Sequence, residues 1–224
     1  MHENKVELLG WYGSDITHAQ SAWVSTDRTL TEEKAQRIDK LLNMLAKEGH
    51  HTPFEKSSLH FLVTSSIDVH IQALKHRIGV SINAESARYK ELKENKFYLP
   101  EDFKQVKVSN SNIRINETYS ADNWFEVLSN VSELTNHLYH ECLKDATTEL
   151  GRKRAKESAR YFKTYNSQIT YDMMFNFRSF MHFQGLRNSE HSQKEIQILA
   201  KQMLQCIKDI EGNPFKYSLE AFLK

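Results

Sequence analysis

The sequence is poor in several residue types that mark common protein classes. Its 224 residues include only 3 prolines, 7 glycines and two cysteines, Cys142 and Cys206. Two cysteines far apart do not form a disulfide framework, and they suit a reducing compartment. So little proline and glycine argues against flexible linkers, so we expect a single folded domain over residues 1–224.

An excess of one charge and long apolar runs are also missing. Lys plus Arg is 30 and Asp plus Glu is 29, which gives a formal net charge of +1. Nucleic-acid and membrane-surface binders need a broad positive excess, so we expect neither partner, and any anion site must be local. No signal segment or membrane span is visible. We therefore expect a cytoplasmic protein, bacterial or, if bacteriophage-encoded, in the host cytoplasm.

Several motifs that carry chemistry in other enzymes are absent. There is no G-x-G-x-x-G, no G-x-x-x-x-G-K-[ST] and no C-x-x-C. The segment HLYHEC offers His137, His140 and Glu141, but it lies on an expected core-building helix, so we expect no metal site. Cys142 and Cys206 fall on apolar helical rows, and we expect them to pack in the core rather than act as nucleophiles.

Hydrophobic periodicity predicts helices interleaved with a few strands. We expect strands over 57–67 and 167–175 and helices over 29–49, 68–77, 122–146, 152–163, 176–186 and 192–214. Residues 95–117 are expected to be loop and irregular strand. This alternation favours an α/β or α+β fold over a helical bundle.

Particular residues are expected to begin these helices or to share a face of them. Thr31 and Asn176 are expected N-caps, and Ser192 with Glu195 an expected capping box. In the helix over 68–77, ended by Gly79, the residues Gln72, Lys75 and His76 are expected on one face. The expected inward residues of the long helix are Trp124, Val127, Val131, Leu134, Leu138 and Cys142.

Two clusters are dense in donors that suit an anion. KHRIGVSINAESARYKELK, residues 75–93, combines Arg forks and Lys point charges, both of which favour phosphate. Its alternative interpretation is a solvated basic helix end. KESARYFK places Glu157 and Arg160 on one helix face, and here a plain surface ion pair is the better interpretation.

Two further clusters mix polar groups with aromatic rings. GHHTPFEK lies between an expected helix and strand, where a simple turn set by Pro53 is the favoured alternative. In NFRSFMHFQGLRNSEH, five polar residues alternate with phenylalanine, methionine and leucine: Asn176, Arg178, His182, Arg187 and His191. That pattern suits an aromatic ring system that also needs hydrogen bonds, or equally a buried helix with polar edges.

Taken together, these segments resemble the flavin-dependent thymidylate synthases. That family's signature is Arg-His-Arg, seven residues, then Ser, with an Arg-Tyr pair just after. Here it reads Lys75-His76-Arg77, then eight residues, then Ser86-Ala87-Arg88-Tyr89. GHHTPFE, ESAR and NFRSFMHFQGLRNSEHSQKEI match in the family's order, and SAWVST and LEAFLK also look familial. The resemblance covers the chain from about residue 20 to its end.

The resemblance implies an enzyme that makes dTMP from dUMP. Methylenetetrahydrofolate would supply the one-carbon unit, and NADPH would reduce a bound FAD, with no cysteine nucleophile. Family members are homotetramers whose active sites are shared between subunits, and their flavin site is not a Rossmann fold. We therefore expect a mixed, largely antiparallel sheet flanked by helices. The alternative is a non-catalytic nucleotide- or RNA-binding protein that uses the same basic clusters.

The matched motifs also imply which residues form the site. Residues that would bind dUMP are Gln72, Lys75, Glu85, Ser86, Arg88, Arg160 and Arg187. Residues that would bind FAD are Ser25, His50, Thr52, Glu55, Lys75, His76, Arg77, Ile78, Asn176, Arg178, His182 and His191. Arg187 would be the catalytic residue, a fixed cation against the uracil edge that stabilises developing negative charge. Glu157 would pair with Arg160 and steady it.

The chain departs from the family pattern at two points. Lys75 stands where the family usually has Arg, which removes a bidentate contact. The signature is also one residue longer between Arg77 and Ser86. Either Ala84 or Glu85 takes the family's acidic position, and an altered or inactive family member is a third hypothesis.

Overall fold

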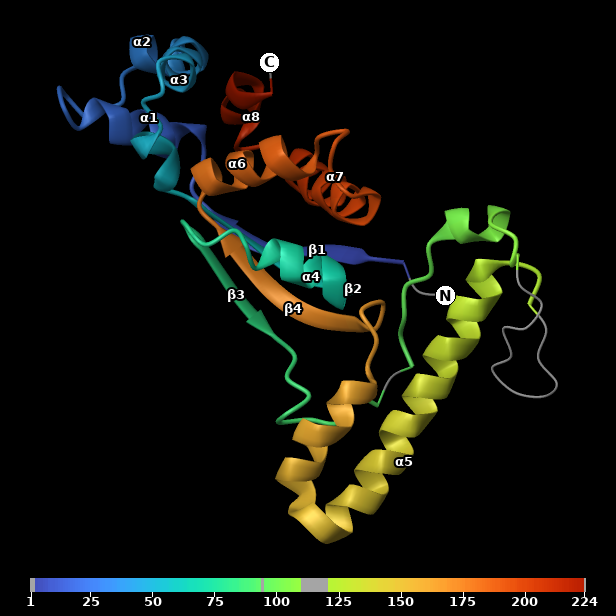
Figure 1. The fold of residues 1–224 in the computed structure, drawn as a ribbon. Helices are drawn as coiled ribbons and strands as arrows, with labels where there is room; N and C mark the ends of the chain where they lie inside the picture. Colours follow the sequence, from blue (N-terminus) through green and yellow to red (C-terminus); the bar gives the residue numbers. More distant parts are fainter. Residues whose placement is uncertain (1–2, 94, 110–120, 224) are drawn as a thin grey trace. The chain divides into compact units, whose positions relative to one another are not determined.

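A computed structural model of the chain describes residues 3–93, 95–109 and 121–223 (Figure 1). The elements in chain order are β1 (Lys5–Tyr12), α1 (Asp15–Trp23), α2 (Glu32–Ala35), α3 (Ile38–Lys47), the 3-10 helix η1 (Thr52–Glu55), β2 (Ser58–Ser66), α4 (Ile67–Ala73), β3 (Val80–Ala84), η2 (Glu101–Gln105), α5 (Trp124–Ala159), η3 (Arg160–Phe162), β4 (Gln168–Phe175), α6 (Phe177–Arg187), α7 (Lys194–Lys208) and α8 (Lys216–Phe222).

The strands form one four-stranded sheet in the order β1-β2-β4-β3. Backbone hydrogen bonds fix the direction of β3 against β4: the Glu85 amide donates to the Thr170 carbonyl and the Asn176 amide to the Gly79 carbonyl, both at 2.9 Å. Residue numbers that rise along one strand fall along the other, so the pair is antiparallel. The predicted mixed fold with a largely antiparallel sheet is confirmed, and this sheet is not the parallel sheet of a Rossmann domain.

The chain divides into two compact units. The first unit is Met1–Asn4, Thr64–Ile71 and Ala84–Thr170, and the second unit is Lys5–Val63, Gln72–Asn83 and Tyr171–Lys224. The boundary between them falls inside β2, α4, β3 and β4.

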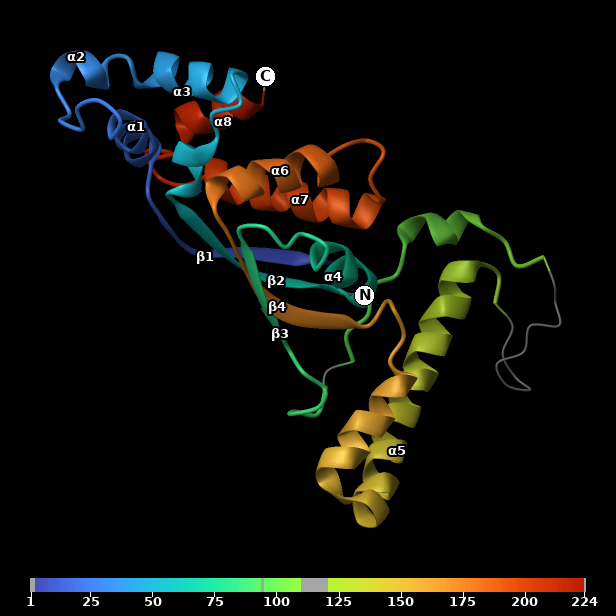
Figure 2. The same ribbon diagram turned by 60° about the vertical axis from the view of Figure 1, so that its left-hand side comes forward.

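The core of the second unit begins at the buried face of β2. Leu59, Phe61 and Val63 are fully buried, as their alternation predicted. Phe61 stacks on Phe180 of α6 with ring centroids 5.8 Å apart, and meets Phe175 of β4 at 6.2 Å. Figure 2 shows α6 lying beside α7, and α7 also packs on β1. The sheet therefore carries the N-terminus of α6 on a rigid support.

A buried polar chain joins the start and the end of the second unit. Ser218 donates to the Asp15 carboxylate at 2.5 Å, and the His18 ring bridges Ser218 and Ser57 at 2.8 Å on each side. Burial lowers the pKa of His18 to about 4, so its ring is neutral at pH 7. The side chains of Asp15, His18, Ser57 and Ser218 therefore each have a hydrogen-bond partner.

The first unit contains a helical hairpin inside α5. Gly151 has φ 73° and ψ 153°, so the helix breaks there into a long arm before it and a short arm after it (Figures 1 and 2). Glycine tolerates this left-handed φ because it has no Cβ. Side chains from both arms form a buried cluster, Tyr139, Leu143, Ala155 and Ala159, with Leu92 and Cys142 packed against it.

Several predicted element details are wrong. Leu134 and Leu138 are 41% and 39% exposed, because the arm turns Tyr139 and Leu143 inward instead. The helix over 29–49 is two helices, although Thr31 caps the first as predicted by accepting from the Lys34 amide. The Ser192–Glu195 capping box does not form, since Ser192 donates instead to the Leu186 carbonyl at 2.6 Å.

Two other segments differ from the sequence patterns. Helix α4 ends at Ala73, so Lys75 and His76 lie in the loop after it rather than on one helical face with Gln72. Within 95–117, the described part contains η2 and isolated bridges at Phe97 and Lys107, and residues 110–117 lie outside the described residues. Among the described helices, none combines the length and the apolar character that a membrane span requires.

Candidate functional site

The loop after α4 is held against the N-terminus of α6 in the second unit. Asn176 caps α6 by accepting from the Ser179 amide at 2.8 Å, as predicted, and its own amide donates to the Gly79 carbonyl. Gly79 has φ 63°, and a Cβ there would collide with the Asn176 side-chain amide and the Ser179 hydroxyl. Glycine at 79 therefore permits both the backbone conformation and the close approach of loop to helix.

A hydrogen bond joins His76 of the predicted FAD set to Arg187 of the predicted dUMP set. The Arg187 Nε–H donates to His76 Nε2 at 2.9 Å, so the proton of the neutral His76 ring is on Nδ1. The pKa of His76 is lowered to about 4, first by burial and then by the charges of Arg187 and His182. His76 also meets the Phe183 ring edge to face, with centroids 4.9 Å apart. The neutral ring thus fixes the orientation of Arg187.

A second contact joins η1 to α6. Arg178 donates from Nη1 to the Glu55 carboxylate at 2.5 Å, and both side chains remain partly exposed. The carboxylate therefore holds the cation at the N-terminal end of α6, where other backbone donors also point outward. Thr52 and Glu55 lie together on η1, which brings GHHTPFE close to α6.

The other predicted flavin residues of the second unit make local contacts or lie on its surface. Ser25 donates to the Ala22 carbonyl at 3.1 Å, and the His191 amide donates to Ser189 Oγ at 3.3 Å. The exposed members of the set are Ser25, His50, Thr52, Lys75, Arg77, Ile78, Arg178, His182 and His191. Ile78 is 88% exposed, which is unusual for an isoleucine.

This donor set fits a flavin dinucleotide. Such a molecule presents two phosphates and a flat ring with polar edges, so it needs accessible cations, hydrogen-bond donors and some apolar surface. Lys75, Arg77 and Arg178 supply the exposed cations, and Ile78 supplies exposed apolar surface next to Arg77.

The first unit contains the other half of the signature, in the loop that follows β3. The Glu85 carboxylate accepts from the Thr170 amide at 3.1 Å and from Lys90 Nζ at 2.6 Å. Ser86 Oγ accepts from the Arg88 amide at 3.3 Å. Ala84 is the last residue of β3. Glu85 is therefore an acid with both oxygens engaged inside the first unit.

The predicted pair of Glu157 with Arg160 is not the pair that the structure contains. Glu157 instead accepts from Arg88 Nε at 2.6 Å and from Arg154 Nη1 at 3.5 Å. Arg160 begins η3, where the chain leaves α5, and its side chain is exposed. The bond to Arg88 lowers the pKa of Glu157, and the same bond raises the pKa of Arg88.

The predicted dUMP residues are divided between the two units. The second unit contains Gln72, Lys75 and Arg187, and the first contains Glu85, Ser86, Arg88 and Arg160. Gln72 donates to Gln193 Oε1 at 2.6 Å, before the start of α7. A hydrogen bond joins Arg187 to His76 of the predicted FAD set.

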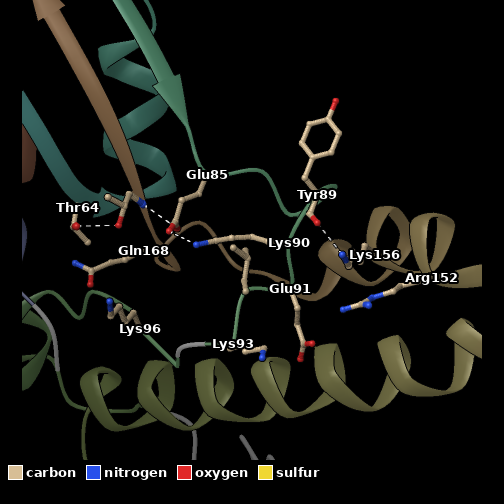
Figure 3. Close-up of a pocket in the computed structure, with 12 residues that line it drawn as sticks. Thr64, Glu85, Tyr89, Lys90, Glu91, Lys93, Lys96, Arg152, Lys156 and Gln168 are labelled. Carbon is tan, nitrogen blue, oxygen red and sulfur yellow. Dashed lines mark hydrogen bonds and ion pairs between the residues drawn. The ribbon is translucent and has the colours of Figure 1, made fainter.

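A cavity of about 400 Å³ in the first unit was missed by sequence reasoning (Figure 3). Its lining includes Lys90, Arg152 and Lys156, none of which belongs to the predicted sets. The signal was present, because Arg152 and Lys156 are four residues apart on one helix and share a face.

The two cysteines are free and partly buried, as residues that pack would be. Cys142 packs against the Tyr139 cluster, and burial raises the pKa of the Cys206 thiol, which disfavours the nucleophilic thiolate. In HLYHEC, His137 is exposed and His140 faces the Glu91 carboxylate at 3.1 Å.

Comparison with known proteins gives consistent matches along the chain. The family model described as "Thymidylate synthase complementing protein" matches residues 7–211. The flavin-dependent thymidylate synthase of Pseudothermotoga lettingae is 33% identical, over 98% of this chain and 90% of its own length. That of Thermosipho melanesiensis is 32% identical over the same shares. A UMP/dUMP methylase from Streptomyces cacaoi, solved with 5-Br dUMP, has a similar fold, with a TM-score of 0.75 and 24% identity over 99% of this chain and 95% of that one.

Proposed function

The chain belongs to the flavin-dependent thymidylate synthase family, and from that premise we propose that it converts dUMP to dTMP with methylenetetrahydrofolate, NADPH and bound FAD. Family membership confirms the predicted resemblance, the enzyme class and the dependence on a flavin. FAD as the form of that flavin, the folate, NADPH and the site residues are our proposals.

The observation that carries this proposal is the hydrogen bond from Arg187 to His76. One residue belongs to the proposed dUMP set and the other to the proposed FAD set. Because Nε of Arg187 is engaged, its terminal nitrogens remain to meet the uracil edge. A fixed cation there favours negative charge that develops on the pyrimidine as C5 becomes nucleophilic. Arg187 is thus the proposed catalytic residue and His76 its support.

The proposed FAD residues hold the cofactor through cations and amide donors. Arg77 and Arg178 suit its phosphates, and Asn176 and His182 suit polar ring edges. When bound, the flavin supplies the reducing equivalents of the reaction. The remaining proposed residues also belong to the second unit: Ser25, His50, Thr52, Glu55, Lys75, His76, Ile78 and His191.

The proposed dUMP residues bind the substrate without covalent attack. Ser86 and Arg88 position the nucleotide, and Glu157 steadies Arg88 through its 2.6 Å hydrogen bond. Arg160, Gln72 and Lys75 contribute further polar contacts. Neither cysteine has a role in this scheme.

We also propose that residues 1–224 act as one functional domain and assemble as a cytoplasmic homotetramer with shared sites. Large apolar side chains beside proposed site residues support this assembly. Ile78 follows Arg77 and is 88% exposed, Tyr89 follows Arg88 and is 74% exposed, and Tyr161 follows Arg160 and is 82% exposed. Surfaces of this kind are covered by ligands or by partner subunits.

The test is NADPH oxidation by the purified, FAD-loaded protein with and without dUMP, followed by dTMP detection after folate is added. We expect dUMP to change the rate of oxidation and dTMP to form only in the complete mixture. Arg187→Gln should abolish dTMP formation, whereas Lys201→Gln, an exposed change on α7, should not. Oligonucleotide binding with a steep salt dependence and no flavin retention would instead support the alternative binding protein.

A further inference from the structure

We propose that the cavity of the first unit is a second anion site, one that binds the phosphate chain of a small polyphosphate. The cavity holds about 400 Å³, within the range of small-molecule sites. Of its lining residues only Glu85 belongs to the proposed dUMP set, and none belongs to the FAD set. Figure 3 shows Arg152 and Lys156 extending from α5 toward the loop that carries Lys90 and Glu91.

The described lining of the cavity is strongly cationic. It contains five cations, Lys90, Lys93, Lys96, Arg152 and Lys156, against two carboxylates, Glu85 and Glu91. Both carboxylates are already engaged, Glu85 by Lys90 and the Thr170 amide and Glu91 by His140. The whole chain has a net charge of only +1, so this local excess is not a property of the overall composition.

Among the described residues, neither Lys156 nor Arg152 has a carboxylate partner. Lys156 is 8% exposed, and its Nζ donates at 2.8 Å to the uncharged carbonyl of Tyr89. Within the described part of the chain, the Arg152 side chain makes no hydrogen bond or ion pair. A buried ammonium without an anion is costly, so a bound anion would compensate it.

The cavity wall is fixed before any anion arrives. Three contacts fasten the loop over 85–93 to α5: Arg88 to Glu157 at 2.6 Å, Lys156 to the Tyr89 carbonyl at 2.8 Å, and the Leu92 amide to the Tyr139 hydroxyl at 3.0 Å. An anion that binds there does not have to order the loop, which favours affinity.

The chemistry of the wall favours phosphates over a base or an apolar ring. Figure 3 shows the Tyr89 ring pointing away from the cavity, so it offers no stacking platform inside. Arg supplies a planar fork and Lys a point charge, and both bind phosphate oxygens well. A second hollow of about 310 Å³ shares Glu91, Arg152 and Lys156 and adds Lys144. A chain of phosphates would therefore meet more cations than a single phosphate.

The experiment is titration calorimetry of the FAD-loaded protein, saturated with dUMP, with sodium tripolyphosphate. Arg152→Gln removes a lining cation that pairs with none of the described residues. Lys153→Gln, on the next residue of the same helix, removes one charge that does not line the cavity. Inorganic phosphate, citrate and dTTP are titrated in parallel, and Lys90→Gln provides a second lining variant. Thermal midpoints of all variants establish that they are folded.

We expect one tripolyphosphate per chain, weaker binding of phosphate and citrate, and roughly tenfold weaker tripolyphosphate binding in Arg152→Gln, the loss typical of one charge-assisted hydrogen bond. Lys153→Gln should change affinity by less than about twofold. Tighter binding of dTTP than of tripolyphosphate would support a nucleotide as the source of the phosphates, and equal binding would support the phosphate chain alone.

Four results would overturn the proposal. They are no tripolyphosphate binding, citrate binding as tightly, equal losses in Arg152→Gln and Lys153→Gln, or tripolyphosphate binding that occurs only when dUMP is left out. The last would make the cavity part of the substrate site. Failure here is distinguishable from failure of the proposed reaction, because turnover of dUMP is measured without any polyphosphate.

Discussion

Arg88 Nε donates to Glu157 at 2.6 Å across 69 residues of sequence, so a signature residue is held by the short arm of α5. The neighbour expected from helical spacing, Arg160, is not the partner. Arg88 lies in the loop after β3 and donates to the Glu157 carboxylate in place of Arg160. The hydrogen bond from Lys156 to the Tyr89 carbonyl holds that loop against the helix. Glu157 is therefore a positioning residue for Arg88.

Replacing Glu157 should weaken dUMP binding without removing activity. We expect Glu157→Gln to raise KM for dUMP by roughly two- to fivefold, the loss typical of a partly exposed ion pair, and to leave kcat within about twofold. Steady-state kinetics measure both. Glu149→Gln, an exposed acid on the same helix, is the control. An equal rise of KM in the control would refute the positioning role.

The contact between Arg187 and His76 has a spectroscopic consequence. With a pKa of about 4, His76 should stay neutral across pH 6–8 and show the Nδ1-protonated tautomer in nitrogen NMR. Arg187→Gln removes a positive neighbour, so the pKa of His76 should rise, although burial still holds it below 6.5. Arg178→Gln, which alters a separate pair with Glu55, should leave that titration in place. A normal pKa for His76 in the unaltered protein would contradict this account.

Gly79 provides a test of how the loop meets α6. Gly79→Ala should destabilise the protein by about 1–2 kcal/mol from the positive φ alone, and further through the collision with Asn176 and Ser179. Gly49→Ala is matched, since Gly49 also has a positive φ, 74°, but a Cβ there meets open space. Thermal unfolding should show the larger loss for Gly79→Ala, with less flavin retained. Equal losses would mean that the close approach is unimportant.

The buried hydrogen bonds of His18 with Ser57 and Ser218 predict that the folded protein loses stability in acid. The pKa of His18 is lowered from 6.5 to about 4 in the folded protein, so the unfolded chain takes up its proton first. The neutral ring contributes stability above pH 6.5, and up to about 3 kcal/mol of it is lost as the pH falls toward 4. Urea unfolding at pH 7, 5.5 and 4.5 measures that slope.

His18→Gln should be less stable at pH 7 but show a shallower loss on acidification, because it has no proton to gain. Asp15, whose pKa burial raises, is present in both proteins and does not account for the difference. His137→Gln, at an exposed histidine, should keep the full slope. Identical slopes for His18→Gln and the unaltered protein would show that this ring does not control the acid response.

Lys75 tests the hypothesis of an altered family member. It is exposed in the loop after α4, so an arginine fits there without repacking. Because a guanidinium adds a bidentate fork, we expect Lys75→Arg to lower KM for dUMP by about threefold to tenfold. Lys40→Arg, at an exposed position on α3, is the control for replacing an ammonium by a guanidinium elsewhere on the protein. A large gain in kcat would instead mean that the native site is impaired.

Sequence patterns anticipated the elements that depend on local chemistry. The alternation in β2, the Asn176 cap of α6 and the two helices predicted over 122–146 and 152–163 follow from spacing and backbone preference. The partner of Glu157 and the cavity cations did not, because they depend on where a distant loop meets α5. The end of α4 at Ala73 was missed for the same reason, since Gly79 and Asn176 fix the loop that follows.

The break at Gly151 also bears on the order in which the chain folds. Tyr139 and Leu143 meet Ala155 and Ala159 over a short stretch of sequence, so the two arms close a small loop and pay little closure entropy. The pairing of β2 with β4 must wait for more than a hundred residues to come together, as the 106-residue separation of Thr64 and Thr170 shows. Local contacts of this kind form faster than distant strand pairs. The helical hairpin is therefore expected to form early. Once formed, it shortens the flexible chain that must close before β4 pairs with β2.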